Sequence, residues 1–172
     1  MPGSIPHMPF TPFHFGPHGT VALPLQRYID LPVFVLANVV VDIEPLTVFV
    51  LNLHSPLHGL CHTFLIGGAL GVLWGAVAWP LREWIGKGMA WLDLPYSPSL
   101  LKMLYSGLLG VWLHVILDAM LYDEMKPFYP LPGNPFLGIL DLKTVYIICT
   151  LFFIPASVMY YRMTVKKPAP CG

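Results

Sequence analysis

The sequence predicts an all-α protein, a polytopic bundle with about four transmembrane helices. Three observations predict this fold class. Apolar residues make up 56% of the chain and charged residues only 10%, against about 25% in an average soluble domain. The formal net charge is zero. Finally, four apolar stretches approach the length of roughly 20 residues that a helix needs to cross the hydrocarbon core.

The same composition excludes other classes of protein. Without a basic excess the chain cannot bind a nucleic-acid backbone well, so no nucleic-acid partner is expected. It is too apolar to be disordered. A soluble protein with so few charges and no net charge would tend to precipitate. The lipid bilayer is therefore the expected surroundings of a single integral membrane domain over residues 1–172.

The domain begins with a segment rich in proline and histidine, residues 1–19, which lacks the apolar core of a signal peptide. The first membrane segment, residues 31–53, is long enough to span. It carries Asp42, Glu44 and Pro45 at its middle, and this predicts a helix that is broken there.

The second membrane segment, residues 63–81, is uncharged, and its spaced glycines let another helix approach closely. The third and fourth segments are residues 99–121 and 144–161. The loop 82–98 has an apolar side and ends in prolines, which predicts a short interfacial helix. Residues 162–172 form a basic tail.

The basic residues also predict an orientation. Lysine and arginine gather in residues 82–102 and in the tail, whereas the link 52–62 has none. Basic loops stay on the cytoplasmic side, so both termini are expected in the cytoplasm. The link 52–62 and the loop 122–143 then face outward. This predicts a multi-pass protein of the inner (plasma) membrane.

Ionisable residues inside the apolar segments are the candidate functional residues, because a charge in the bilayer is costly. Asp42 and Glu44 cannot both stay ionised in lipid without a cation. His58 and His62 are four residues apart, so a helix would put both rings on one face, as in a metal-binding pair. The alternatives are a helix break that lines water and histidines at the membrane interface.

His114 and Asp118 are also four residues apart. Asp118 can be a metal ligand or an acceptor that orients the histidine, or the pair can make a polar contact between helices. One cluster near the outer half of the membrane is expected from six residues: Asp42, Glu44, His58, His62, His114 and Asp118. His14 joins it only if residues 14–30 form a re-entrant or short spanning piece, and His54 lies just before the expected helix.

Together these motifs resemble a family of small membrane-bound metal-dependent hydrolases, the YdjM-like, LexA-regulated inner-membrane proteins. The family pattern is an N-terminal histidine, a D-x-D or D-x-E pair, an H-x-x-x-H-[ST] run and a later H-x-x-x-D. The matching residues are His14, Asp42, Glu44, His58, His62, Thr63, His114 and Asp118. Broader relatives often carry an arginine where this chain has Gly59, so a possible anion-binding group is missing here.

The resemblance implies a hydrolase, and the ligand types predict one or two divalent ions, zinc first and manganese or iron next. Activated water would attack an ester, amide or phosphoester bond of a lipid-like substrate, with Glu44 or Asp118 as the general base. Two non-enzymatic alternatives stay open. One is a haem electron carrier that uses His58 or His62 with His114. The other is an accessory subunit of a membrane complex, with a structural metal or none; a homo-oligomer is also compatible.

Overall fold

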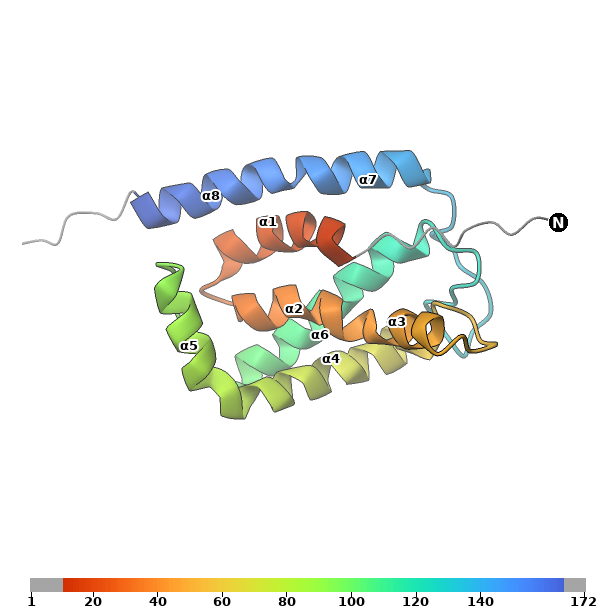
Figure 1. The fold of residues 1–172 in the computed structure, drawn as a ribbon, viewed down its shortest axis with the longest axis horizontal. Coiled ribbons are helices and arrows are strands. Elements are labelled where there is room, and N and C mark those ends of the chain that lie inside the picture. Colours follow the sequence, from red (N-terminus) through yellow and green to blue (C-terminus); the bar gives the residue numbers. More distant parts are fainter. Residues whose placement is uncertain (1–10, 166–172) are drawn as a thin grey trace, which may run out of the picture.

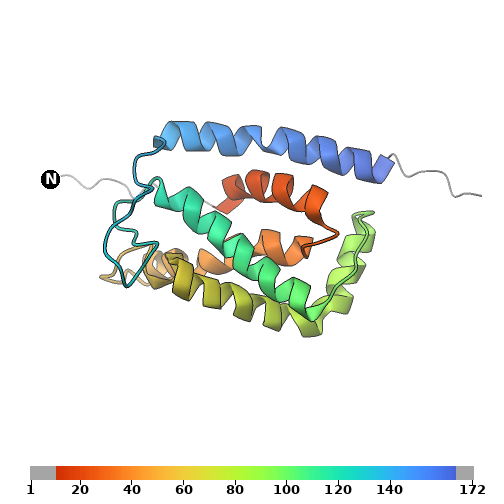
Figure 2. The same ribbon diagram turned by 180° about the vertical axis from the view of Figure 1, so that it is seen from behind.

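The computed structural model describes residues 11–165, and within this range the chain is helical and contains no strand. The predicted all-α fold is therefore confirmed for the described residues. The first ten residues of the Pro/His-rich segment and residues 166–172 of the basic tail lie outside them. Figures 1 and 2 show the helices as an elongated bundle.

Four helical stretches are long and apolar enough to cross a membrane, which is consistent with a membrane protein: Leu31–Val50, Phe64–Trp91, Leu100–Ala119 and Leu142–Val165. They overlap the four predicted segments, although the second stretch continues beyond the predicted residues 63–81 as far as Trp91. The second stretch consists of α4 (Phe64–Ala78), a 3-10 turn and α5 (Arg82–Trp91). Figure 1 shows α5 turned away from the axis of α4, where the sequence predicts an interfacial helix.

The first stretch is broken where the sequence predicts it. Helix α2 (Leu31–Val41) ends and α3 (Ile43–Val50) begins on either side of Asp42. Pro45 explains the break, because it has no backbone N–H and its ring clashes with the carbonyl four residues earlier, that of Val41. Figure 1 shows α3 turned out of the line of α2. The break leaves Asp42 at the corner between two helices.

One helix lies outside the predicted elements. Helix α1 (Phe15–Leu25) follows a 3-10 turn at Thr11–His14 and lies between α2 and the pair α7–α8 (Figures 1 and 2). Helix α7 is Leu142–Leu151 and α8 is Phe153–Val165. The sequence predicts that His14 reaches the other candidate ligands only if residues 14–30 form a re-entrant or short spanning piece, and α1 is the helix found in this part of the chain.

Helix α1 also affects the count of passes along the bundle. Helix α1 runs along the bundle in the same direction as the pair α7–α8, whereas α2 runs in the opposite direction (Figures 1 and 2). A chain that passes along the bundle four times ends on the side where its first pass began. The prediction that both termini face the cytoplasm counted only those four crossings and did not include α1.

Helices α4 and α6 (Leu100–Ala119) pack along each other through glycines. A methyl group at Gly71 would overlap the carbonyl oxygen of Gly107, and one at Gly75 would overlap that of Met103. Small residues on facing helices allow this close backbone approach in a membrane. The packing fixes the start of α4 against α6, so that His62, just before α4, lies near His114 and Asp118 on α6.

Candidate metal centre

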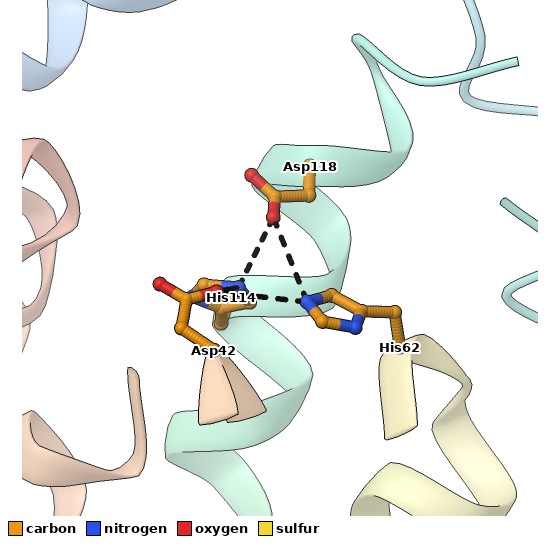
Figure 3. Close-up of side chains that lie close together, drawn as sticks. All are labelled: Asp42, His62, His114 and Asp118. Atoms are coloured by element: carbon orange, nitrogen blue, oxygen red, sulfur yellow. Dashed lines mark ion pairs between the residues drawn. The ribbon is translucent and has the colours of Figure 1, made fainter. Parts of the chain in front are cut away.

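Four ionisable side chains meet at one end of the bundle, and they come from three separate segments. Asp42, His62, His114 and Asp118 each offer one ligand atom, and these atoms all lie within 4.8 Å of one another (Figure 3). The two histidines and Asp118 are buried, and Asp42 is partly exposed. This set is the candidate metal centre, and it unites the first, second and third membrane segments.

His114 is the residue that connects the two carboxylates. It lies one turn before Asp118 on α6, so both side chains leave the same face of the helix. Its Nε2 atom is 3.1 Å from Asp118 Oδ2 and 3.2 Å from Asp42 Oδ1. His62 Nε2 is 3.6 Å from Asp42 Oδ1 and 3.9 Å from Asp118 Oδ2. All four groups therefore face one point (Figure 3).

The backbone before α4 differs from the expected helix. Residues 51–59 are irregular and Leu60–His62 forms a 3-10 turn, so His58 and His62 do not share the face of an α-helix. Pro56 and Gly59 account for this, because neither residue favours a helix interior. The loop still brings the two rings together, since each Nε2 atom is 3.9 Å from Asp118 Oδ2.

Two of the histidines are held by carboxylates on their outer side. His58 Nδ1 donates to Glu124 Oε1 at 2.9 Å, and His62 Nδ1 donates to Glu44 Oε2 at 3.1 Å. An ionised carboxylate can only accept, so the proton of each neutral ring lies on Nδ1. Each Nε2 atom keeps its lone pair for the cluster. Such carboxylate–histidine pairs commonly orient histidine ligands in metal sites.

The third histidine is held by an amide. Asn38 Nδ2 donates to the carbonyl oxygen of Val35 at 2.8 Å, which directs Asn38 Oδ1 toward His114. His114 Nδ1 lies 3.1 Å from this oxygen and donates to it. His114 therefore presents Nε2 to the two carboxylates, as His62 does.

The cluster has the properties that a cation would satisfy. Within the described residues, His62 Nε2, His114 Nε2 and Asp118 Oδ1 are buried and make no hydrogen bond. Buried polar atoms without a partner are rare because they cost free energy. Two imidazole nitrogens and two carboxylates are ligands that divalent transition metals accept. The donor set thus fits a metal ion.

The other predicted ligands surround the cluster. Glu44 lies behind His62, where it also accepts from the backbone N–H of Cys61 at 3.0 Å. His14 Nε2 is 3.4 Å from Asp118 Oδ1. His58 adjoins Asp118, as described above. His54 is exposed in the loop before α4 and is not among the four grouped ligands.

Two supporting residues are absent from the sequence prediction, Asn38 and Glu124. The sequence offered one indication of Asn38, because it is the only amide within the apolar run of α2. The structure shows that this side chain is fully buried. No such indication existed for Glu124. It lies 66 residues after His58 in a loop, and only the folded chain brings the two together.

The surroundings also shift the pKa values of three side chains in the segment just before α4. Burial lowers the pKa of His58 even though Asp118 is close, and this favours the neutral form of the ring. Burial opposes the charge of His62 as well, but hydrogen bonds to Asp42 and Glu44 outweigh it and raise the pKa of this ring. Burial and Glu44 raise the pKa of Cys61 to about 11, which disfavours the thiolate that a metal would require.

Gly59 has a structural role in this arrangement. A Cβ atom at this position would lie 2.7 Å from Glu44 Oε1. Any side chain here would therefore displace the carboxylate that holds His62. The hydrogen bond between Glu44 and His62 therefore requires a glycine at position 59.

Replacing Glu44 by alanine is expected to weaken metal binding about 10- to 100-fold, the usual cost of losing a partner that orients a ligand. Metal affinity of the purified protein, measured by competition with a chelating dye, tests this. Glu83→Ala is the matched control, because Glu83 is an exposed acid on α5. Equal affinities for the two variants would show that Glu44 does not support the site.

No family model, curated protein or solved structure matches the chain. The resemblance to membrane-bound metal-dependent hydrolases stays a prediction from the motifs.

Proposed function

We propose that the protein is a metal-dependent hydrolase embedded in the membrane, which cleaves an ester, amide or phosphoester bond of a lipid-like substrate. One observation carries this proposal. Three imidazole rings, those of His58, His62 and His114, point Nε2 at the same oxygen of Asp118, while each Nδ1 atom is hydrogen-bonded. Histidines held in this way are typical of a prepared metal site.

In this proposal His62, His114 and Asp118 hold the ion, and His58 stands close enough to join them. The mixture of imidazole and carboxylate ligands suits zinc first, and also manganese or iron. A divalent ion bound here would activate a water molecule for attack at neutral pH.

The proposal gives the carboxylates different tasks. Glu44 positions His62, because its carboxylate accepts from His62 Nδ1 rather than facing the cluster. Asp42 is the proton acceptor that we favour. Its side chain is 18% exposed, against 2% for Asp118, so it is the carboxylate of the cluster that a water molecule and a substrate can approach. Asp118 stays at the centre as a ligand.

A cavity beside the cluster supports an amphipathic substrate. It has a volume of about 220 Å³, and His58 forms part of its wall as well as part of the site. Apolar side chains such as Pro56 and Leu60 line it together with the polar groups of Glu124 and Lys126. A small head group with the first part of an apolar chain would fit these walls. Leu60 lines the cavity and is exposed on the surface of the protein.

The haem alternative fits the site less well. A haem between His62 and His114 would need the space in which the carboxylates of Asp42 and Asp118 lie, because all four ligand atoms fall within 4.8 Å. Because two carboxylates occupy the space that a porphyrin would need, the site favours a metal ion without a porphyrin.

Removing the metal is expected to abolish hydrolysis. The test uses the purified protein in lipid vesicles with fluorogenic medium-chain esters, amides and phosphodiesters, before and after a chelator, and after zinc or manganese is restored. Asp42→Asn is expected to lose at least the roughly 100-fold that general-base catalysis contributes. Asp123→Asn is the control, because Asp123 is exposed and is not one of the four grouped ligands.

Two results would contradict the proposal. One is hydrolysis that is unaffected by the chelator or by Asp42→Asn. The other is a protein that holds its metal but cleaves none of the substrates; it would favour an accessory subunit with a structural metal.

A further inference from the structure

We infer that the substrate of the proposed hydrolase is an amphiphile with a negatively charged head group, which Lys126 binds. The inference rests on the proposed function and names the class of substrate for the same site. It comes from the cavity of about 220 Å³ beside the metal centre. The wall of this cavity includes both Lys126 and His58, and His58 Nε2 lies 3.9 Å from Asp118 Oδ2. One small cavity therefore joins the candidate metal centre to a positive charge.

Lys126 brings an unpaired charge to this cavity. Its side chain is exposed, and among residues 11–165 it makes no ion pair and no side-chain hydrogen bond. Glu124 lines the same cavity but pairs with His58 instead, because its Oε1 atom accepts from the backbone N–H of His58 at 3.0 Å and from Nδ1 at 2.9 Å. An ammonium group has three donors and no acceptor. An anion is therefore the partner that Lys126 can bind.

The remaining polar side chains of the cavity also favour an anion. Thr63 Oγ1 donates to the carbonyl oxygen of Leu60 at 2.9 Å and accepts from the backbone N–H of Ile66 at 3.1 Å, so this hydroxyl group is already used. The hydroxyl group of Tyr129 makes no hydrogen bond within the described part of the chain. The two polar side chains of the cavity wall that make no hydrogen bond, Lys126 and Tyr129, can thus both donate one.

The backbone around Lys126 is anchored on both sides. Met125 is 1% exposed and belongs to the hydrophobic core. The carbonyl oxygen of Pro127 accepts from the backbone N–H of Phe64 at 2.8 Å, and Phe64 is the first residue of α4. The loop that carries Lys126 is therefore tied to the helix that follows His62. A charge on an anchored backbone costs less entropy to place against a ligand than one on a free loop.

The apolar part of the wall calls for a chain next to the anion. Pro56 and Leu60 line the cavity. A free inorganic anion would leave these side chains in contact with water, whereas an alkyl chain would cover them. A neutral amphiphile would cover them but leave the ammonium group of Lys126 without a partner. An amphiphile with an anionic head group makes use of both parts of the wall.

Binding of small probes to the purified full chain in a neutral detergent tests this inference without any need for turnover. Hexyl phosphate, hexanol and inorganic phosphate are titrated separately by isothermal titration calorimetry, with empty micelles as the blank. We expect hexyl phosphate to bind more tightly than the other two. Its affinity should fall as sodium chloride is added, because salt screens a pair of exposed charges. Hexanol or inorganic phosphate that binds as tightly as hexyl phosphate would overturn the inference.

Variants of Lys126 assign the charge. Lys126→Gln is expected to weaken binding of hexyl phosphate about fivefold, the upper value for an exposed ion pair, and to leave hexanol unaffected. Lys126→Arg keeps the charge and is expected to keep the affinity. Lys143→Gln is the matched control, because Lys143 is exposed at the start of α7 and does not line the cavity. Equal affinities of Lys126→Gln and Lys143→Gln for hexyl phosphate would overturn the inference.

The inference and the proposed function fail in different ways. Hydrolysis that a chelator stops, together with binding of hexyl phosphate that is unchanged in Lys126→Gln, would overturn the inference alone. A protein that binds hexyl phosphate through Lys126 but cleaves no substrate would contradict the proposed function, while the anion-binding role of Lys126 would stand.

Discussion

Replacing His114 by alanine is expected to abolish metal binding and, with it, hydrolysis. His114 is fully buried on α6, and its Nε2 atom lies within 3.2 Å of carboxylate oxygens of both Asp42 and Asp118. Its loss removes one ligand and leaves two carboxylates facing each other without the group between them. The loss of affinity should therefore exceed the roughly 10- to 100-fold expected for a residue that only orients a ligand.

Metal content after dialysis and the far-ultraviolet circular dichroism of the same sample test this prediction together. The helical content should remain, because α6 keeps its contacts with α4 through Gly107 and its neighbours. His54→Ala is the control, since His54 is an exposed histidine in the loop that carries His58. A His114→Ala variant that retains its metal while folded would show that the cluster is not the metal site.

A leucine in place of Gly107 is expected to destabilise the fold and to remove the metal site at the same time. Any side chain at Gly107 would overlap the backbone carbonyl of Gly71, which cannot rotate away as a flexible side chain can. Overpacking usually lowers the free energy of unfolding by about 1–3 kcal/mol. Because the clash here is with the backbone, we expect a loss at or above the upper end of this range. Helices α4 and α6 would have to separate, and this separation moves His62 away from His114.

Thermal unfolding in detergent, followed by metal titration below the transition, measures both effects. Gly88→Leu is the matched control, because nothing lies within 4 Å of a Cβ atom at Gly88, on the exposed side of α5. A Gly107→Leu variant with the stability and the metal affinity of the Gly88 variant would contradict the close packing of α4 against α6.

Most of the fold could be predicted because it depends on segment length and composition. Four apolar stretches of spanning length become four helical stretches, and Pro45 breaks the first one for a local steric reason. Helix α1 could not be predicted in this way. It has 11 residues with Pro17 and Pro24 inside it, which is too short for a span and unfavourable as an isolated helix. Packing against α2 and α8 stabilises it instead.

The candidate site could be predicted in part. The motif spacings indicated the ligands, because His114 and Asp118 lie one turn apart on a helix whatever else surrounds them. The expected helix across His58 and His62 was wrong, since Pro56 and Gly59 keep this stretch irregular. The groups that hold the imidazoles could not be predicted. Asn38 lies 76 residues from His114, so only the tertiary fold makes it a partner.

X-ray absorption spectroscopy at the zinc edge of the purified, zinc-loaded protein tests the central claim most directly. We expect nitrogen and oxygen ligands at about 2.0–2.1 Å, with the additional scattering of imidazole rings. Zinc held by sulfur at about 2.3 Å would assign the ion to a cysteine such as Cys61, and a protein that retains no zinc would leave the cluster without a metal. Either of these two results would contradict the account.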